Sequence, residues 1–396
     1  MSLYVAGDEA RIRAATRVRA WTRSGLLTAA QDAAIQADLR VDVRRTNRYL
    51  RFALFVFGTI VVWAAVGLSL LLFDVKQDWA IAWTAILAGG IALVLASFLV
   101  VRFRLYRFGI EEALAVWSVA LAALGAGFLT SATMRGDDGP ALVACVTAAI
   151  ASVAVYWLFG YLYAACAAVA ALAATAFWVG LPRFAAHLLS ALMLMGVFLV
   201  ARRLRRPRGD DFPGDDYGVI EAIAWAGCYV VLNLRLTLNF MPAFLGIRAA
   251  TDVPAAFYWA TYTATWLLPA TGLILGLREK HRPMIWSGLS TAIATLLTNK
   301  AYLGGTPNTW DPILLGVLLA GTSILVRRWL AAGPGGHRFG FTSQSLVASD
   351  DKDRISVLGA VAAVQQPIAA RTPSEEPAFE AGRGGRSGGA GGGTDF

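Results

Sequence analysis

The chain has 396 residues, of which 57% are hydrophobic and only 15% charged. Soluble domains are nearer 45–50% apolar and about 25% charged, so this composition excludes a water-soluble enzyme, a disordered chain and a disulfide-stapled secreted module. The formal charge of +9 would indicate nucleic-acid binding in a soluble protein. Here most of the excess lies in short loops beside apolar segments, where basic residues orient membrane proteins. We therefore expect an all-α, polytopic transmembrane helical bundle with no nucleic-acid partner.

Residues 1–48 are expected to form a small cytoplasmic helical cap. Residues 8–23 are rich in Ala and Arg, Ser24-Gly25 interrupts them, and Thr28 and Gln31 fit a capping box that starts a second helix. No apolar run in this region is long enough for a signal peptide, so the first membrane segment is expected to be an uncleaved anchor. The basic residues at the end of the cap are expected to contact anionic lipid headgroups, namely Arg44, Arg45 and Arg48.

Apolar segments follow the cap, and each approaches the roughly 20 residues that a helix needs to cross a bilayer. They span 52–73, 79–101, 113–134, 141–158, 162–181, 184–200, 219–240, 255–277, 283–302 and 312–329. They predict about ten crossings, with six helices in a first bundle over 49–201 and four in a second over 218–330. The fifth segment carries alanine on every face. Because small residues let helices approach closely in a membrane, we expect it at the centre of the bundle.

The basic residues indicate the orientation. If the N-terminus is cytoplasmic, the clusters at 40–51, 102–107, 202–208, 278–282 and 327–328 all fall on the cytoplasmic side. This is the distribution that the positive-inside rule describes. The sequence therefore predicts a multi-pass protein of the bacterial inner membrane with both termini in the cytoplasm. A basic cytoplasmic linker is expected over 202–217, with Arg203 and Arg206 against anionic headgroups.

After residue 330 the composition changes to Pro, Ser, Gly and charged residues. Such a segment cannot bury enough apolar surface to offset the entropy of ordering it. We expect residues 331–396 to form a disordered, Gly-rich cytoplasmic tail.

The stretch Val-Arg-Ala-Trp-Thr-Arg-Ser-Gly-Leu-Leu-Thr-Ala-Ala-Gln from Val18, followed by basic residues and two crossings, resembles the start of a group of uncharacterised prokaryotic polytopic membrane proteins. These proteins share an N-terminal helical cap and are defined by a domain of unknown function. Trp310-Asp311-Pro312 and Gly333-Pro334-Gly335-Gly336 are also similar to segments of bacterial membrane proteins. The resemblance implies residence in a prokaryotic inner membrane and a helical bundle, and it implies no catalytic residue or substrate.

No motif for a metal, a nucleotide or a catalytic nucleophile is present in the sequence, so we predict no catalytic residue, no metal and no cofactor. His187 is the sole histidine within a membrane segment. We favour an interhelical hydrogen bond for it over a role in a proton relay. Glu221 is expected to meet the basic cluster at 202–208, and a coupling carboxylate is the alternative.

Polar residues gather near the predicted outer ends of the seventh and ninth segments. They are Asn233, Arg235, Thr237 and Asn239 in one, and Thr295, Thr298, Asn299 and Lys300 in the other. We favour snorkelling of Arg235 and Lys300 to lipid phosphates, with Lys300 paired to Asp311. The alternative is a cationic pocket for an anionic ligand, in which Arg235 and Lys300 face each other. Its candidate residues are Arg235, Lys300, Asn233, Asn239, Asn299 and His187.

Three classes of function remain. We favour a membrane scaffold or sensor that acts through its cytoplasmic ends and binds a cytoplasmic protein partner. The alternative is a transporter or flippase for an anionic solute or lipid, which would use the cationic outer pocket. An intramembrane enzyme ranks third, because no acid–base pair is expected at one depth of the membrane.

Overall fold

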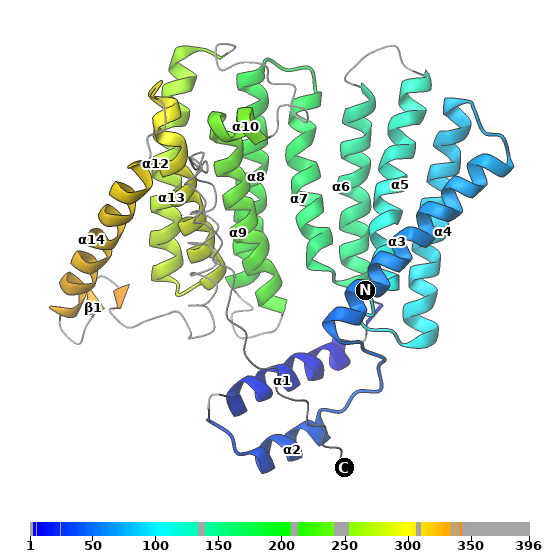
Figure 1. Cartoon of the computed structure of the whole chain (residues 1–396), viewed down its shortest axis with the longest axis horizontal. Helices are drawn as coiled ribbons and strands as arrows, with labels where there is room; N and C mark the ends of the chain where they lie inside the picture. The colour runs from blue at the N-terminus through cyan, green and yellow to red at the C-terminus, as the bar shows by residue number, and fades with distance from the viewer. Residues whose placement is uncertain are drawn as a thin grey trace, which may run out of the picture.

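The computed structural model describes residues 3–4, 6–23, 25–133, 139–206, 213–240, 253–305, 310–333, 337–338 and 341–342. These residues are almost entirely helical (Figure 1). The helices are α1 (Ala6–Arg23), α2 (Ala29–Asp38), α3 (Arg48–Leu72), α4 (Asp78–Phe103), α5 (Ile110–Thr133), α6 (Gly139–Phe159), α7 (Leu162–Thr175), the 3₁₀ turn η1 (Ala176–Trp178), α8 (Arg183–Arg205), α9 (Pro213–Leu232), α10 (Leu234–Phe240), α12 (Ala255–Arg278), α13 (Arg282–Tyr302) and α14 (Asp311–Ala331). A short hairpin, β1 (His337–Arg338) and β2 (Phe341–Thr342), follows them.

Every predicted apolar segment coincides with a helix, so the all-α expectation is confirmed. Two segments are interrupted, since 162–181 divides into α7 and η1, and 219–240 divides into α9 and α10. Among the described residues, 5 helices are long and apolar enough to cross a membrane: α3, α4, most of α5, α6 and α8. A shorter apolar helix covers Leu162–Trp178. The chain is thus built as a membrane protein, while the count of ten crossings stays a prediction.

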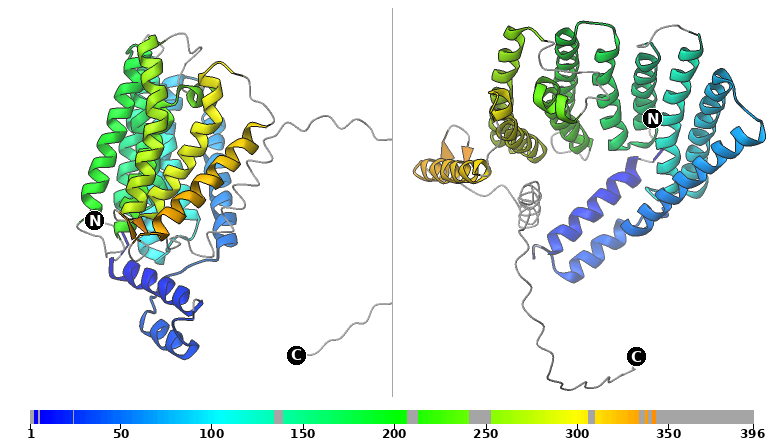
Figure 2. Two further views of the ribbon diagram at one scale, coloured as in Figure 1. Left: turned by 90° about the vertical axis from the view of Figure 1, so that its left-hand side faces the viewer. Right: turned by 45° about the horizontal axis from the view of Figure 1, so that its top comes forward.

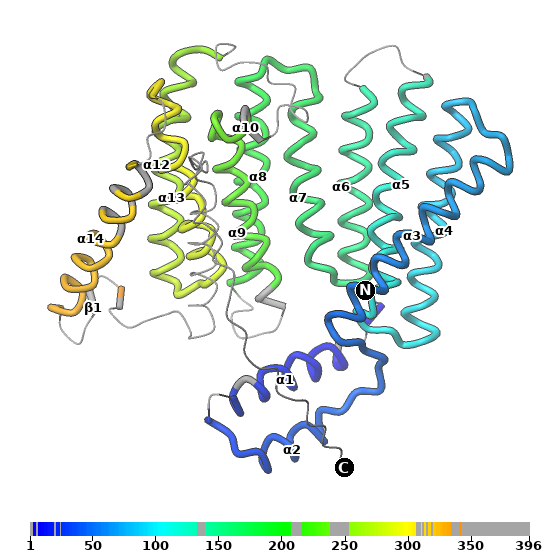
Figure 3. The backbone as a smooth tube through the Cα atoms, viewed as in Figure 1, coloured from blue at the N-terminus to red at the C-terminus, as the bar shows by residue number. Residues whose placement is uncertain are grey.

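The long helices stand side by side, and α1 and α2 lie beneath one end of them (Figures 1 and 2). We call α1 and α2 the cap, the end of the bundle beside them the cap end, and the opposite end the far end. Figure 3 follows the backbone from the blue cap through the cyan and green helices to α14 in orange.

Two helix starts show how local sequence sets the boundaries at the cap end. Thr28 and Gln31 form the predicted capping box, in which the Gln31 amide N–H donates to the Thr28 hydroxyl at 3.3 Å and the Thr28 amide N–H donates to Gln31 Oε1 at 3.0 Å. At the start of α3, Asn47 Oδ1 accepts from the Leu50 amide at 2.7 Å. Both side chains satisfy backbone donors that the first helical turn leaves open.

The buried apolar residues form two clusters, which we call the first and second packing units. The first unit joins α3, α4, α5 and α6 and includes Tyr4 and Ala164. The second joins α7, α8, α9 and α13 and includes Ala165 and Val169. Helix α7 therefore contributes to both units through neighbouring residues, which agrees with the central position that its alanines predict.

This division differs from the predicted boundary between 49–201 and 218–330. Helices α8 and α9 belong to one unit, because Gly227 lets the Leu194 side chain approach to 3.3 Å from the position of a Cβ. The predicted linker over 202–217 is also partly helical, since α8 continues to Arg205 and α9 begins at Pro213. Within the tail predicted as disordered, His337 pairs with Thr342 and Arg338 with Phe341. Residues 343–396 lie outside the described residues.

Glycines bring the helices of each unit into close contact. A Cβ at Gly125 of α5 would lie 2.7 Å from the Ala82 carbonyl oxygen of α4. In the second unit, a Cβ at Gly276 of α12 would lie 2.8 Å from the Ile285 backbone nitrogen of α13, and Gly272 faces Gly288. The Gly272-x-x-x-Gly276 motif thus packs within the chain. Close backbone approach of this kind is how helices associate where lipid tails are as apolar as leucine.

We predict that Gly125→Leu lowers the free energy of unfolding by about 1–3 kcal/mol, because the new side chain forces α4 and α5 apart. Thermal unfolding of the purified protein in detergent measures the change. Gly90→Leu is the matched control, since it lies on α4 with nothing within 4 Å of the position of its Cβ. Equal melting temperatures for the two variants would contradict the close packing of α4 on α5.

Candidate functional site

Several polar residues predicted at the outer membrane boundary lie where α9 ends and α10 begins. Together with three tyrosines they form what we call the far-end cluster: Asn233, Arg235, Thr295, Thr298, Tyr229, Tyr258 and Tyr302. Asn233 is the one residue between the two helices. Its backbone N–H still donates to the Tyr229 carbonyl at 2.8 Å, and its side-chain oxygen accepts from the Leu236 amide at 3.1 Å. Asn233 therefore ends one helix and caps the next, as short polar side chains do at helix N-termini.

Asn233 also connects α9 to α13. Its side-chain amide donates to the Tyr229 hydroxyl at 2.8 Å and to the Thr298 hydroxyl at 2.9 Å. The Tyr229 hydroxyl in turn lies 2.9 Å from Thr295 Oγ1. Asn233, Tyr229 and Thr295 are each at most 2% exposed, so this chain of hydrogen bonds is buried inside the second packing unit.

The aromatic residues of α12 and α13 complete the far-end cluster. The Tyr302 hydroxyl accepts from the Leu234 amide at 2.6 Å, and the Tyr258 hydroxyl donates to the Tyr302 carbonyl at 2.8 Å. Arg235 donates from Nη2 to the Tyr258 hydroxyl at 3.1 Å, and its Cζ lies 5.9 Å from the centre of that ring. The Nε of Arg235 is buried and makes no hydrogen bond in the described structure.

The structure places the remaining predicted pocket residues as follows. Asn299 Oδ1 accepts from the Tyr262 hydroxyl at 2.9 Å. Lys300 is half-buried in the last turn of α13. The side chains of Asn239 and Asp311 lie outside the described residues, so the pairing of Lys300 with Asp311 stays a prediction. Arg235 thus contacts Tyr258 and Asn299 contacts Tyr262, one turn farther along α12, which the sequence did not indicate.

His187 is buried to 1% exposure next to this cluster. Its Nδ1 lies 2.7 Å from the Val231 carbonyl oxygen of α9, two residues before Asn233. Phe177 and Phe257 contact the imidazole ring, with centroids at 4.9 and 6.3 Å. The predicted interhelical hydrogen bond between α8 and α9 is confirmed.

Charges gather at the opposite end of the second unit. Glu221 of α9, only 1% exposed on its side chain, accepts from Arg205 Nε at 2.6 Å and from Arg202 Nη1 at 3.4 Å. Both arginines also pair with Glu279, which follows α12. The contact of Glu221 with the basic cluster is therefore as predicted. Glu279 was missed, although an acidic residue within the basic run 278–282 is the signal that could have identified it.

The start of the chain, through Leu3, Tyr4 and α1, contacts both packing units. The Leu3 amide donates to the Leu158 carbonyl at 2.7 Å, and the Tyr4 hydroxyl lies 2.9 Å from the Tyr161 hydroxyl. These contacts hold the start of the chain against the α6–α7 connection of the first unit. Farther along the chain, Arg13 of α1 pairs at 3.5 Å with Asp216 of the second unit.

Burial raises the pKa of the Asp216 carboxyl above its ordinary value, and the nearby charges of Arg13 and Arg107 limit this rise. Ile12, Ala15 and Val18 of α1 are buried, and Gln36 of α2 donates to the Ala15 carbonyl at 2.9 Å. The helical cap expected from the sequence therefore has a buried face of its own.

The basic residues after the cap contact the α4–α5 connection, while their side chains stay exposed. The Arg44 backbone exchanges hydrogen bonds with the segment between α4 and α5, accepting from the Tyr106 amide at 3.1 Å. The Arg45 guanidinium carbon lies 5.6 Å from the centre of the Tyr106 ring. Even so, Arg44, Arg45 and Arg48 are exposed, as are Arg203 and Arg206 at the end of α8, so headgroup binding by them stays a prediction.

Within the described ranges, no group of three His, Cys, Asp or Glu residues is arranged to hold a metal ion. The far-end cluster offers hydroxyl, amide and guanidinium donors, and the cap end offers arginine–carboxylate pairs. Donors of this kind can bind and orient an anion or hold helices together.

No family model, no curated protein and no solved structure matches this chain. The resemblance to uncharacterised prokaryotic membrane proteins thus stays a prediction from the sequence.

We predict that Glu221→Gln lowers the free energy of unfolding by about 3–5 kcal/mol, because it removes the buried one of the two carboxylates that neutralise Arg202 and Arg205. Chemical denaturation in detergent measures the loss. Glu279→Gln is the matched control within the same network, since its side chain is 28% exposed and water can replace part of the interaction, which limits the loss to about 1 kcal/mol. A larger loss for the Glu279 variant would contradict the central position of Glu221.

Proposed function

We propose that this chain is a multi-pass protein of the bacterial inner membrane that works as a scaffold or sensor through its cap end. In this proposal the cap end is cytoplasmic, the bundle makes about ten crossings, and a cytoplasmic protein binds there. The observation that supports the proposal is that the start of the chain contacts both packing units: Leu3 and Tyr4, just before α1, contact Leu158 and Tyr161, and Arg13 of α1 contacts Asp216. A change in the arrangement of the units would therefore reach the cap.

The far-end cluster supports the same choice. Asn233, Tyr229, Thr295 and Thr298 bond to one another and to backbone groups. Buried polar groups that satisfy one another stabilise a helix junction, and their donors are already used. A solute that entered here would have to break these bonds first.

The test uses the full chain in lipid nanodiscs, one set of phosphatidylcholine and one containing phosphatidylglycerol. Hydrogen exchange of the α1 amides should differ between the two bilayers, because the exposed arginines at the cap end respond to anionic headgroups. Identical exchange in both bilayers would argue against a sensor.

We predict that Arg13→Ala raises the exchange rate of the α1 amides about fivefold in either bilayer, because one charged hydrogen bond of at least ~1 kcal/mol to the second unit is lost. Arg11→Ala is the control, since this residue is exposed on the same helix. Unchanged exchange in the Arg13 variant would show that the contact with Asp216 does not hold the cap.

A transporter or flippase for an anionic solute or lipid is the second candidate. It is supported by the interruption of the helix at Asn233 and by the buried, unbonded Nε of Arg235. Discontinuous helices form the binding sites of many transporters, where the ends of half-helices meet a charged substrate.

For this candidate we expect glycerol phosphate to raise the melting temperature of the purified protein, and Arg235→Ala and Lys300→Ala to abolish the rise. Lys76→Ala is the control, because this exposed lysine pairs with Asp74 in the α3–α4 connection. If the unaltered protein shows no shift at millimolar glycerol phosphate, the transporter candidate is excluded for this ligand class.

A further inference from the structure

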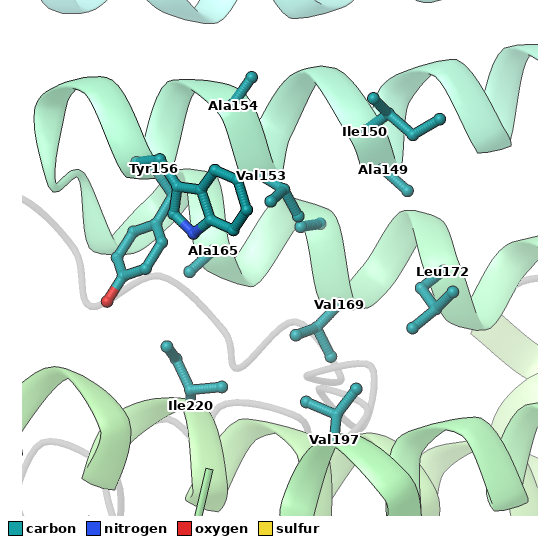
Figure 4. A pocket seen from close by; sticks show the side chains of 12 residues that line it. Ala149, Ile150, Val153, Ala154, Tyr156, Ala165, Val169, Leu172, Val197 and Ile220 are labelled. Carbon is teal, nitrogen blue, oxygen red and sulfur yellow. The ribbon is translucent and has the colours of Figure 1, made fainter. Parts of the chain in front are cut away.

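An apolar cleft of about 580 Å³ separates α6 from α8 and α9 (Figure 4). Its floor is α7, which contributes Ala165, Ala168 and Val169. Ile150, Val153 and Trp157 of α6 form one wall and are 38% to 69% exposed. No charged residue lines the cleft, and the walls α6 and α8 are both long and apolar enough to cross a membrane. The open side of the cleft therefore faces hydrocarbon.

The cleft lies in the half of the bundle near the cap. Along α6 it runs from Ala149 to Trp157, which is about 12 Å at 1.5 Å per residue. One leaflet supplies about half of the roughly 30 Å hydrocarbon core, so the length of the cleft matches the depth of a single leaflet. Tyr156 and Trp157 line the cleft at its cap end, and Figure 4 shows Tyr156 on the same helix as Val153. Amphipathic aromatic rings of this kind favour the membrane–water boundary.

Positive charge lies about two turns farther along α8 toward the cap end. Arg203 and Arg206 of α8 are exposed and lie about 9 and 14 Å along the helix beyond Val197, which lines the cleft. An anionic headgroup is the bilayer component that complements such charges at this depth. An apolar cleft left empty would lose the dispersion contacts of its walls, whereas a hydrocarbon chain restores them.

We propose that the cleft binds one acyl chain of an anionic phospholipid from the leaflet at the cap end, with its headgroup at Arg203 and Arg206. The chain fills the space between the first and second packing units along α7. This lipid site is independent of whether the protein senses, scaffolds or transports.

The first experiment measures lipid retention. The full chain is reconstituted with phosphatidylcholine and phosphatidylglycerol, extracted into detergent, and analysed by native mass spectrometry. We expect one phosphatidylglycerol to remain bound. Val153→Trp should reduce retention about tenfold, because the indole displaces about two methylene groups from the cleft. Arg203→Gln with Arg206→Gln should remove the preference for phosphatidylglycerol over phosphatidylcholine.

Leu192→Trp is the matched control, since Leu192 is a 68% exposed residue of α8 that does not line the cleft. It should retain the lipid as the unaltered chain does. If the unaltered chain retains no lipid, or if the Leu192 and Val153 variants lose it equally, the lipid is only part of the annulus and the proposal fails.

A second measurement needs no variant and so does not depend on folding of a mutant. Phosphatidylglycerol with a photoreactive diazirine on its acyl chain is irradiated in bilayers that contain the unaltered protein. Peptides over 149–157 and 165–172 should be labelled well above the peptide over 60–72 of α3, whose side chains are among the most exposed. Labelling in proportion to exposure alone would overturn the proposal.

Discussion

The structure depends on one constraint, which is that buried polar groups must find their partners within the protein. Helix α9 illustrates it at both ends. Near the cap, Glu221 is enclosed by Arg202 and Arg205. At the far end, where the helix is interrupted, the Tyr302 hydroxyl accepts from the Leu234 amide and Asn233 caps the next turn. The backbone donors that the interruption leaves open are thus satisfied by Asn233 itself and by Tyr302 of α13.

The hydroxyl residues satisfy this constraint in two ways. On α4, Thr84 and Ser97 donate to carbonyls one turn back in their own helix, at 2.8 Å each. On α13, Ser287 donates to the Ala222 carbonyl of α9, and Thr295 donates to the Thr265 carbonyl of α12. Interhelical bonds of this kind hold helices together in a membrane, where apolar contact alone gives little selectivity. Helix α13 is therefore hydrogen-bonded to both α9 and α12.

The sequence identified the long helices of the bundle well, because each of them is a long run of apolar residues. The capping box at Thr28 and the pairing of Glu221 with the arginines were also predictable, since both depend on nearby residues or on one cluster of opposite charge. The interruption at Asn233 was not predictable, because an asparagine between leucines can continue a helix. Here Thr298 binds the Asn233 side chain and Tyr302 binds the Leu234 amide, and both partners are more than sixty positions away. The contacts of Tyr4 with Tyr161 and of Arg13 with Asp216 were not predictable either, because they also join segments far apart in the sequence. The sequence thus indicated that Asn233 and Arg235 lie in one polar region, but it did not indicate the hydrogen bond of Arg235 to Tyr258.

In our proposal, the position of α7 lets the cap end respond to the membrane. Its alanines contribute to both packing units, so small side chains lie where the units meet. The apolar cleft lies at this junction, and at the cap end Leu3, Tyr4 and Arg13 connect the start of the chain with Leu158, Tyr161 and Asp216. A shift of one unit against the other changes the width of the cleft and the distance that α1 must bridge. In our proposal, what occupies the cleft and how the cap is held are therefore two consequences of the same movement.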